Sequence, residues 1–208
     1  QIVYVSDGVQ AFLSQSKNHK NNKGIMQMKF MSPTSGKSAQ IEAELSIIIY
    51  HFLKKNRRIL QKAYQGAGIQ IIPSPDQYGN LGFIFVGRSL KQINYANELI
   101  ESFVAFEMKD WELDNSIKVI LDSLEKSEED SISNQLFVYD GQVNKTTRWT
   151  RDQVVEAMKD VTLESVIKTH KDFMGTSFLD IYAYGNYESG KLKTFAKKKL
   201  AVASVELS

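Results

Sequence analysis

Histidine is the residue type in this chain best suited to acid–base or metal chemistry, and the sequence holds three, at His19, His51 and His170. No two of them lie within helical reach, so the His-x-x-x-His spacing of many zinc sites is absent. His51 and His170 lie beside the apolar stripes of expected helices, which is typical of packed histidines, whereas His19 lies in a polar loop. A site assembled from all three in space stays open, but nothing in the pattern favours it.

Other catalytic signals are also missing. The chain has no cysteine, which excludes thiol nucleophiles, disulfides and Cys-type zinc sites. It has no Gly-x-Ser-x-Gly elbow and no phosphate-binding Gly-x-x-x-x-Gly-Lys-Ser/Thr loop. The acidic groups at Asp110/Glu112/Asp114 and at 128–130 lie near the ends of expected helices, where solvated capping explains them. The sequence therefore predicts no catalytic residue and no metal ligand in this chain.

One strand resembles part of a nucleic-acid-binding motif. Gly82-Phe83-Ile84-Phe85-Val86 is similar to the aromatic strand of an RNA-recognition motif, but that motif requires a basic residue first and a small residue in the middle. This chain has Leu81 and Ile84 there, and alternation places Phe83 and Phe85 on one face, as core packing requires. We therefore expect no nucleic-acid partner.

Composition is that of a globular protein, with 42% hydrophobic and 24% charged residues in 208. The longest apolar runs, such as Ile47–Tyr50, are too short to span a bilayer, and no signal peptide is visible. The chain begins without Met, which indicates a piece of a longer chain.

The net charge is +2, but the charges are unevenly distributed: residues 1–66 and 191–199 are basic, and residues 98–130 are acidic. Such blocks are typical of solvated faces or of surfaces that meet a charged partner.

Hydrophobic periodicity predicts the elements that must position these residues. Two extended runs, Val9–Gln15 and Ile25–Met31, are predicted to form an antiparallel pair. A helix follows from about Ser38, and a hairpin follows from strands around Ala67–Ile71 and Leu81–Val86. Then come helices near Gln92–Phe106 and Glu112–Glu129, an irregular stretch at 130–149, and helices capped by Thr150 and Thr162. A strand at Leu179–Tyr184 and a basic helix near Glu188–Val202 complete the chain.

This order predicts one α+β domain over residues 1–208, with a mostly antiparallel sheet and helices packed on one face. The expected core comprises Leu45, Ile48, Phe52, Phe83, Phe85, Leu121, Ile167 and Ile181.

Several stretches together resemble one family. They are Trp149-Thr150-Arg151-Asp152-Gln153, Val161-Thr162-Leu163-Glu164-Ser165-Val166, Leu179–Tyr187 with its Gly185-Asn186, and upstream Phe30-Met31-Ser32-Pro33 and Tyr78–Phe83. In order and spacing the chain resembles the pitrilysin/insulinase family of zinc metallopeptidases, and best the domain that opens their C-terminal half.

The resemblance implies a non-catalytic domain, because the family's His-x-x-Glu-His zinc motif is absent here. It implies a parent chain that is a zinc metalloendopeptidase, with zinc in its catalytic domain and no cofactor in this one. Expected partners are the other domains of that chain and a peptide substrate held in the closed chamber. A bacterial parent would imply a periplasmic location. The alternative is a non-peptidase scaffold subunit of the same fold that binds protein partners, and the flanking sequence would separate the two.

If helices cover one face of the sheet, the family's architecture turns the other face toward the substrate chamber. Strand alternation assigns to that face Ile84, Val86, Asp180, Tyr182 and Tyr184. Tyrosine suits a wet apolar wall, because its ring is broad and its tip polar. Packing under a loop or a neighbouring domain explains the same residues equally well.

Overall fold

A six-stranded sheet organises the described part of the chain. The computed structural model describes residues 2–15, 22–74, 80–126 and 149–205. The strands are β1 (Ile2–Ser6), β2 (Val9–Ser14), β3 (Lys23–Met31), β4 (Ile69–Pro73), β5 (Leu81–Arg88) and β6 (Phe178–Gly185). Their order is β1-β2-β6-β3-β5-β4, and every neighbouring pair is antiparallel except the parallel pair β2–β6.

The pairing differs from expectation at one side of the sheet. We predicted that the runs now seen as β2 and β3 pair with each other, and this is wrong, because β6 lies between them. Both contact β6 along its length, with Leu13 and Met26 each opposite Ala183. β2 instead forms a hairpin with β1, a strand that the periodicity analysis did not predict. The hairpin of β4 and β5 is confirmed.

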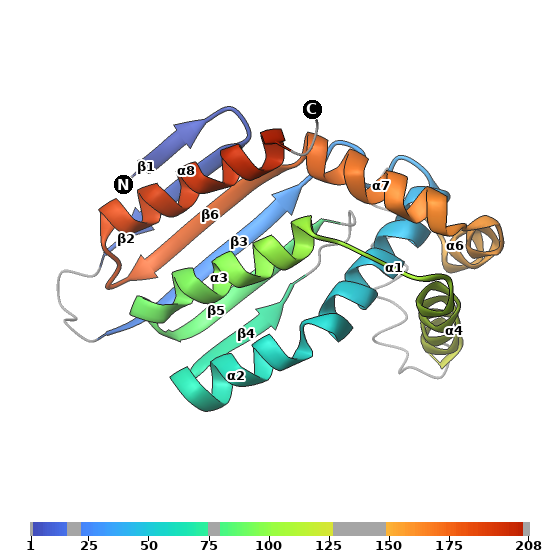
Figure 1. The fold of residues 1–208 in the computed structure, drawn as a ribbon, viewed down its shortest axis with the longest axis horizontal. Coiled ribbons are helices and arrows are strands. Elements are labelled where there is room, and N and C mark those ends of the chain that lie inside the picture. The colour runs from blue at the N-terminus through green and yellow to red at the C-terminus, as the bar shows by residue number, and fades with distance from the viewer. Residues whose placement is uncertain (1, 16–21, 75–79, 127–148, 206–208) are drawn as a thin grey trace.

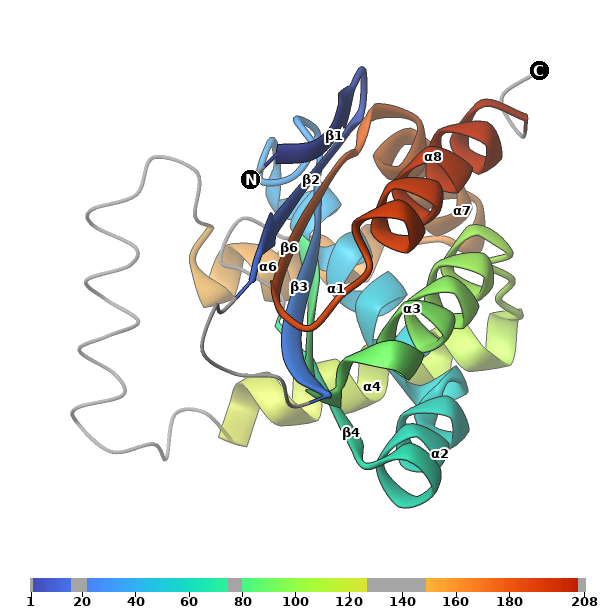
Figure 2. The ribbon, with the colours of Figure 1, turned by 90° about the vertical axis from the view of Figure 1, so that its left-hand side faces the viewer.

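Helices lie on one face of this sheet. They are α1 (Ala39–Lys55), α2 (Arg57–Ala67), α3 (Ser89–Val104), α4 (Asp110–Lys126), α6 (Arg151–Ala157), α7 (Leu163–Thr176) and α8 (Ser189–Val205), with a 3₁₀ turn at Met158–Asp160. Figure 1 shows α2, α3 and α8 covering the sheet and running roughly along its strands, with α1, α4, α6 and α7 grouped at one end. In Figure 2 the sheet is seen from its edge, with α2, α3 and α8 on the same side of it. The predicted α+β class with helices on one face is confirmed.

Local signals explain where several helices begin and end. The predicted capping residues both form capping boxes, Thr150 with Gln153 and Thr162 with Ser165. The helix expected from Ser38 is broken at Asn56, which separates α1 from α2. The Asn56 side-chain Nδ2 and backbone N–H both donate to the Phe52 carbonyl, at 2.9 and 3.0 Å. These two bonds satisfy the buried amide at the break.

The core lies between the sheet and the helices. Of the predicted members, Leu45, Ile48, Phe52, Phe83, Phe85 and Ile181 are buried. Leu121 and Ile167 are only half-buried, which corrects that expectation. On α7 the inward positions are Val166, His170 and Phe173, so the stripe is centred one residue earlier than Ile167.

None of the helices in the described segments has the length and apolarity to cross a bilayer.

Candidate functional site

The sheet face opposite the helices carries all five predicted site residues. On β6 the inward residues Leu179, Ile181 and Ala183 are buried, and strand geometry points the alternate residues the other way. Tyr182 and Tyr184 are 47% and 44% exposed, and Asp180 is half-buried. Ile84 and Val86 on β5 are half-buried on the same face. These five residues therefore lie opposite the helix-covered face, and their role in a substrate chamber stays a prediction.

Strand register joins these residues into two rows across the sheet. In the first row, Ile25 on β3 lies opposite both Tyr184 and Val86. In the second, Tyr182 lies opposite Phe12 and Gln27, and Ile84 lies opposite Gln27 and Ile72. We call this surface the open sheet face, and its apolar members are Phe12, Ile25, Ile72, Ile84, Val86, Tyr182 and Tyr184. Ile25 and Ile72 are 45% and 38% exposed, so the apolar surface is continuous with the tyrosines and accessible.

Polar groups interrupt the apolar rows without making a catalytic set. Asp180 lies opposite Gln10 on one side and Lys29 on the other, so a carboxylate and an ammonium group occupy adjacent strands. Gln27 and Gln70 supply amides on β3 and β4. Such a surface can bury apolar side chains and hydrogen-bond to a polypeptide, which is the chemistry of binding.

Three apolar members of the open sheet face were not predicted: Phe12, Ile25 and Ile72. A signal for one of them was present, because Met26, Met28 and Phe30 alternate with Ile25, Gln27 and Lys29 along β3. The rows that join these residues to the tyrosines depend on strand pairing, which alternation within a single strand does not contain.

A buried hydrogen-bond network holds the end of β6 in place. The Tyr187 hydroxyl donates to Gln92 Oε1, and Gln92 Nε2 donates to the carbonyls of Gly24 and Gly87, at 3.0 and 3.2 Å. Burial raises the pKa of the Tyr187 phenol, so the hydroxyl stays a donor. A Cβ on Gly24 would lie 2.6 Å from the Tyr187 ring, which explains the glycine at this position. The network ties the ends of β3, β5 and β6 to α3.

His51 and His170 both hold the connection between α3 and α4. His51 Nε2 lies 3.0 Å from the Glu107 carbonyl, and His170 Nε2 lies 2.8 Å from the Phe103 carbonyl. The Phe106 ring stacks on His170 at 4.6 Å and meets His51 edge-on at 5.5 Å. Burial lowers the pKa of His51, and it lowers the pKa of His170 to about 4. The prediction that these are packed histidines is confirmed, and His19 lies outside the described residues.

In each of these imidazoles Nε2 faces a carbonyl and carries the proton, so Nδ1 is the ring nitrogen that keeps a lone pair. Within the described ranges no three histidine or carboxylate side chains are grouped as metal ligands. Of the acidic groups, Glu112 in the first turn of α4 accepts from the Lys109 N–H at 2.9 Å, as capping predicts, while 128–130 lies outside the described residues. Phe83 and Phe85 are buried, so their rings are not accessible for stacking with bases.

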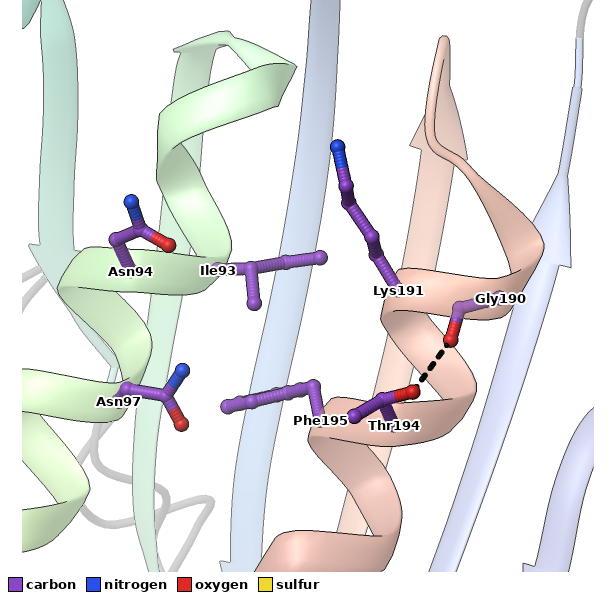
Figure 3. Close-up of a pocket in the computed structure, with 7 residues that line it drawn as sticks. All are labelled: Ile93, Asn94, Asn97, Gly190, Lys191, Thr194 and Phe195. Carbon is purple, nitrogen blue, oxygen red and sulfur yellow. Dashed lines mark hydrogen bonds between the residues drawn. The ribbon is translucent and has the colours of Figure 1, made fainter.

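A shallow pocket lies between two helices on the other side of the sheet. It has a volume of about 390 Å³ and is lined by Ile93, Asn94 and Asn97 of α3 and by Gly190, Lys191, Thr194 and Phe195 of α8. Figure 3 shows the two sets facing each other, with Thr194 Oγ1 donating to the Gly190 carbonyl at 2.9 Å. The Lys191 ammonium is paired with Glu188 at 2.8 Å. No group in this lining is arranged for catalysis.

The fold that carries the open sheet face is similar to that of a solved protein structure. The crystal structure of pitrilysin superposes with a TM-score of 0.87 over 97% of this chain, at 12% sequence identity. The chain has a pitrilysin-like fold. It spans about a fifth of that protein, covering 21% of its length. No protein-family model matches the chain, and no curated protein matches it in sequence.

The pitrilysin-like fold confirms the fold that the sequence resemblance implied. At this identity the likeness establishes the fold alone, and function has to be argued from the site.

Proposed function

We propose that this chain is a non-catalytic domain of an insulinase-type zinc metallopeptidase and that its open sheet face forms part of the wall that encloses a peptide substrate. The zinc of such a peptidase would belong to a different domain of the parent chain. The partners would be the other domains of that chain and the enclosed peptide.

The observation that carries the proposal is the exposure of the open sheet face. Isolated soluble domains rarely leave a continuous apolar surface uncovered, and such surfaces mark binding sites. Here Ile25, Tyr182 and Tyr184 lie on adjacent central strands and are all more than 40% exposed. The pitrilysin-like fold supports a place for this surface inside a larger peptidase.

The mixture of groups favours a polypeptide ligand. The tyrosine rings provide apolar contact area and their hydroxyls hydrogen-bond, while Gln27 offers an amide beside Tyr182 and Gln70 offers one on the edge strand β4. Neither tyrosine is close to a group that could hold a metal in the described residues, so the face would bind the substrate without taking part in its cleavage.

Replacing Tyr182 and Tyr184 together by Ser tests the proposal. Binding of an unstructured, uncharged apolar peptide to the chain, measured by fluorescence anisotropy, should weaken at least tenfold, because two rings leave the contact surface. The melting temperature should change little, because neither ring is part of the core. Tyr64→Ser is the matched control: Tyr64 is 67% exposed on α2, and its loss should leave peptide binding unchanged.

In a full-length parent peptidase the same double variant should raise KM more than it lowers kcat. The chain by itself should retain no equivalent of zinc through dialysis and should cleave no peptide. Chelator-sensitive cleavage by the chain would contradict the non-catalytic role. A double variant that binds peptide as well as the unchanged chain would instead contradict the role of the face and favour a scaffold of the same fold.

A further inference from the structure

Five cations crowd the corner where α1 meets α2. Lys54, Lys55, Arg57, Arg58 and Lys62 are all exposed, and we call them the basic corner. Residues 45–75 contain these five cations and no acidic residue. Within the described part of the chain, none of the five is joined to a carboxylate by an ion pair.

Helix electrostatics explains only part of this cluster. Lys54 and Lys55 lie in the last turn of α1, where the helix dipole favours cations. Arg57 and Arg58 open α2, where the dipole disfavours them, and the first turn of α2 has no acid to compensate. The Asn56 side chain does not cap α2 either. Folding therefore does not account for the two arginines, which are better explained by an anionic partner.

The shape of the basic corner suits an extended or helical partner. The apolar side of α2 is turned to the core, with Ala63 and Ala67 buried. Its solvent side carries Arg58 and Lys62 one helical turn apart, and amides at Gln61 and Gln65 accompany them. The single large apolar side chain that α2 exposes is Tyr64, so α2 lacks the broad apolar face with which interfacial helices enter a bilayer.

The acidic helix α4 packs against α1, which carries Lys54 and Lys55, and so limits what can bind at the basic corner. Glu112 of α4 raises the pKa of His51, and the two lysines lower it. Asp110 and Asp114 are exposed on α4. A long polyanion or a charged membrane surface would meet these carboxylates, and the whole chain carries only +2. A short segment would contact the cations alone.

We propose that the basic corner docks a short carboxylate-rich segment of polypeptide. Arginine supplies paired N–H donors that match a carboxylate, and an acidic helix with side chains four residues apart would match the spacing of Arg58 and Lys62.

The probe is a short glutamate-rich helical peptide, and its affinity for the chain is measured by fluorescence anisotropy at several salt concentrations. Binding should be detectable at low salt and weaken as salt increases. Arg58→Glu with Lys62→Glu should weaken it more than tenfold. Lys193→Glu with Lys197→Glu is the matched control, since these two exposed lysines have the same spacing on α8 and give the same charge change. The control should lower affinity less than threefold.

A second variant separates docking from folding. Arg57→Glu with Arg58→Glu places acids in the first turn of α2, so the melting temperature should rise while peptide binding is lost. A loss of binding that accompanies unfolding would not meet this expectation and would contradict the proposal.

Duplex DNA and phosphatidylserine vesicles serve as comparison ligands. Tighter binding of either one than of the acidic peptide, abolished by the Arg58/Lys62 variant, would overturn the proposal in favour of that partner. Equal effects of the α2 and α8 variants, or no peptide binding at low salt, would also overturn it.

Discussion

At the scale of single residues, Phe83 shows how one ring joins the sheet to α1. Its side chain is 1% exposed and meets the Phe52 ring in a T-shaped contact at 5.9 Å. Replacing Phe83 by Ala should lower the free energy of unfolding by about 3–5 kcal/mol, because the change removes buried apolar area and leaves a cavity. Urea denaturation measures this, with the exposed Tyr64→Ala as a control that should change stability by less than about 0.5 kcal/mol. A loss below about 1 kcal/mol for Phe83→Ala would contradict its place in the core.

His170 makes the stability of the chain depend on pH. Its folded-state pKa is about 4, against an ordinary value of 6.5, because burial disfavours the charged imidazolium. The unfolded chain therefore binds more protons between these two values, and stability should fall as pH decreases from about 6.5 toward 4. The slope from this one group approaches about 1.4 kcal/mol per pH unit.

Unfolding free energies at pH 7, 6 and 5 test this, with His170→Gln as the variant. Glutamine keeps a donor for the Phe103 carbonyl but does not titrate, so the variant should lose less stability on acidification than the unchanged chain. Equal slopes for both proteins would show that His170 does not carry the effect.

At the scale of elements, local hydrogen bonds determine where helices begin, and tertiary contacts determine where a long helix is interrupted. Thr150 and Thr162 begin their helices because their hydroxyls accept from backbone N–H groups that no helical carbonyl reaches. The apolar stripe of α1, in contrast, does not predict the break at Asn56 between α1 and α2. The break turns the chain so that α2 can pack on β4, which brings Arg57 and Arg58 to a helix N-terminus.

At the scale of the whole molecule, the last strand completes the sheet from inside. β6 hydrogen-bonds with both β2 and β3, so β2 and β3 are not paired with each other within the sheet. A chain that ends at residue 176 would lose β6 and α8 and expose the inner edges of β2 and β3. Such a chain should show no cooperative thermal transition by circular dichroism.

Deletion of residues 2–6 is the control, because β1 is an edge strand with a single neighbour. This variant should unfold at a lower temperature but still cooperatively. A cooperative transition in the chain that ends at residue 176 would contradict the central role of β6.

By itself the sequence determined the types of the elements other than β1, the two capping residues Thr150 and Thr162, and the alternation of buried and exposed residues along β5 and β6. Each of these depends on residues close together in the chain, because caps act over three residues and strand faces alternate with period two. The same alternation placed Ile84, Val86, Asp180, Tyr182 and Tyr184 on the open sheet face. Only the tertiary structure decided that β6 separates β2 from β3 and that Phe12 and Ile25 lie beside the tyrosines. The physical reason is that inter-strand hydrogen bonds join backbone groups common to every residue, so partners distant in sequence are selected by the packing of the whole core.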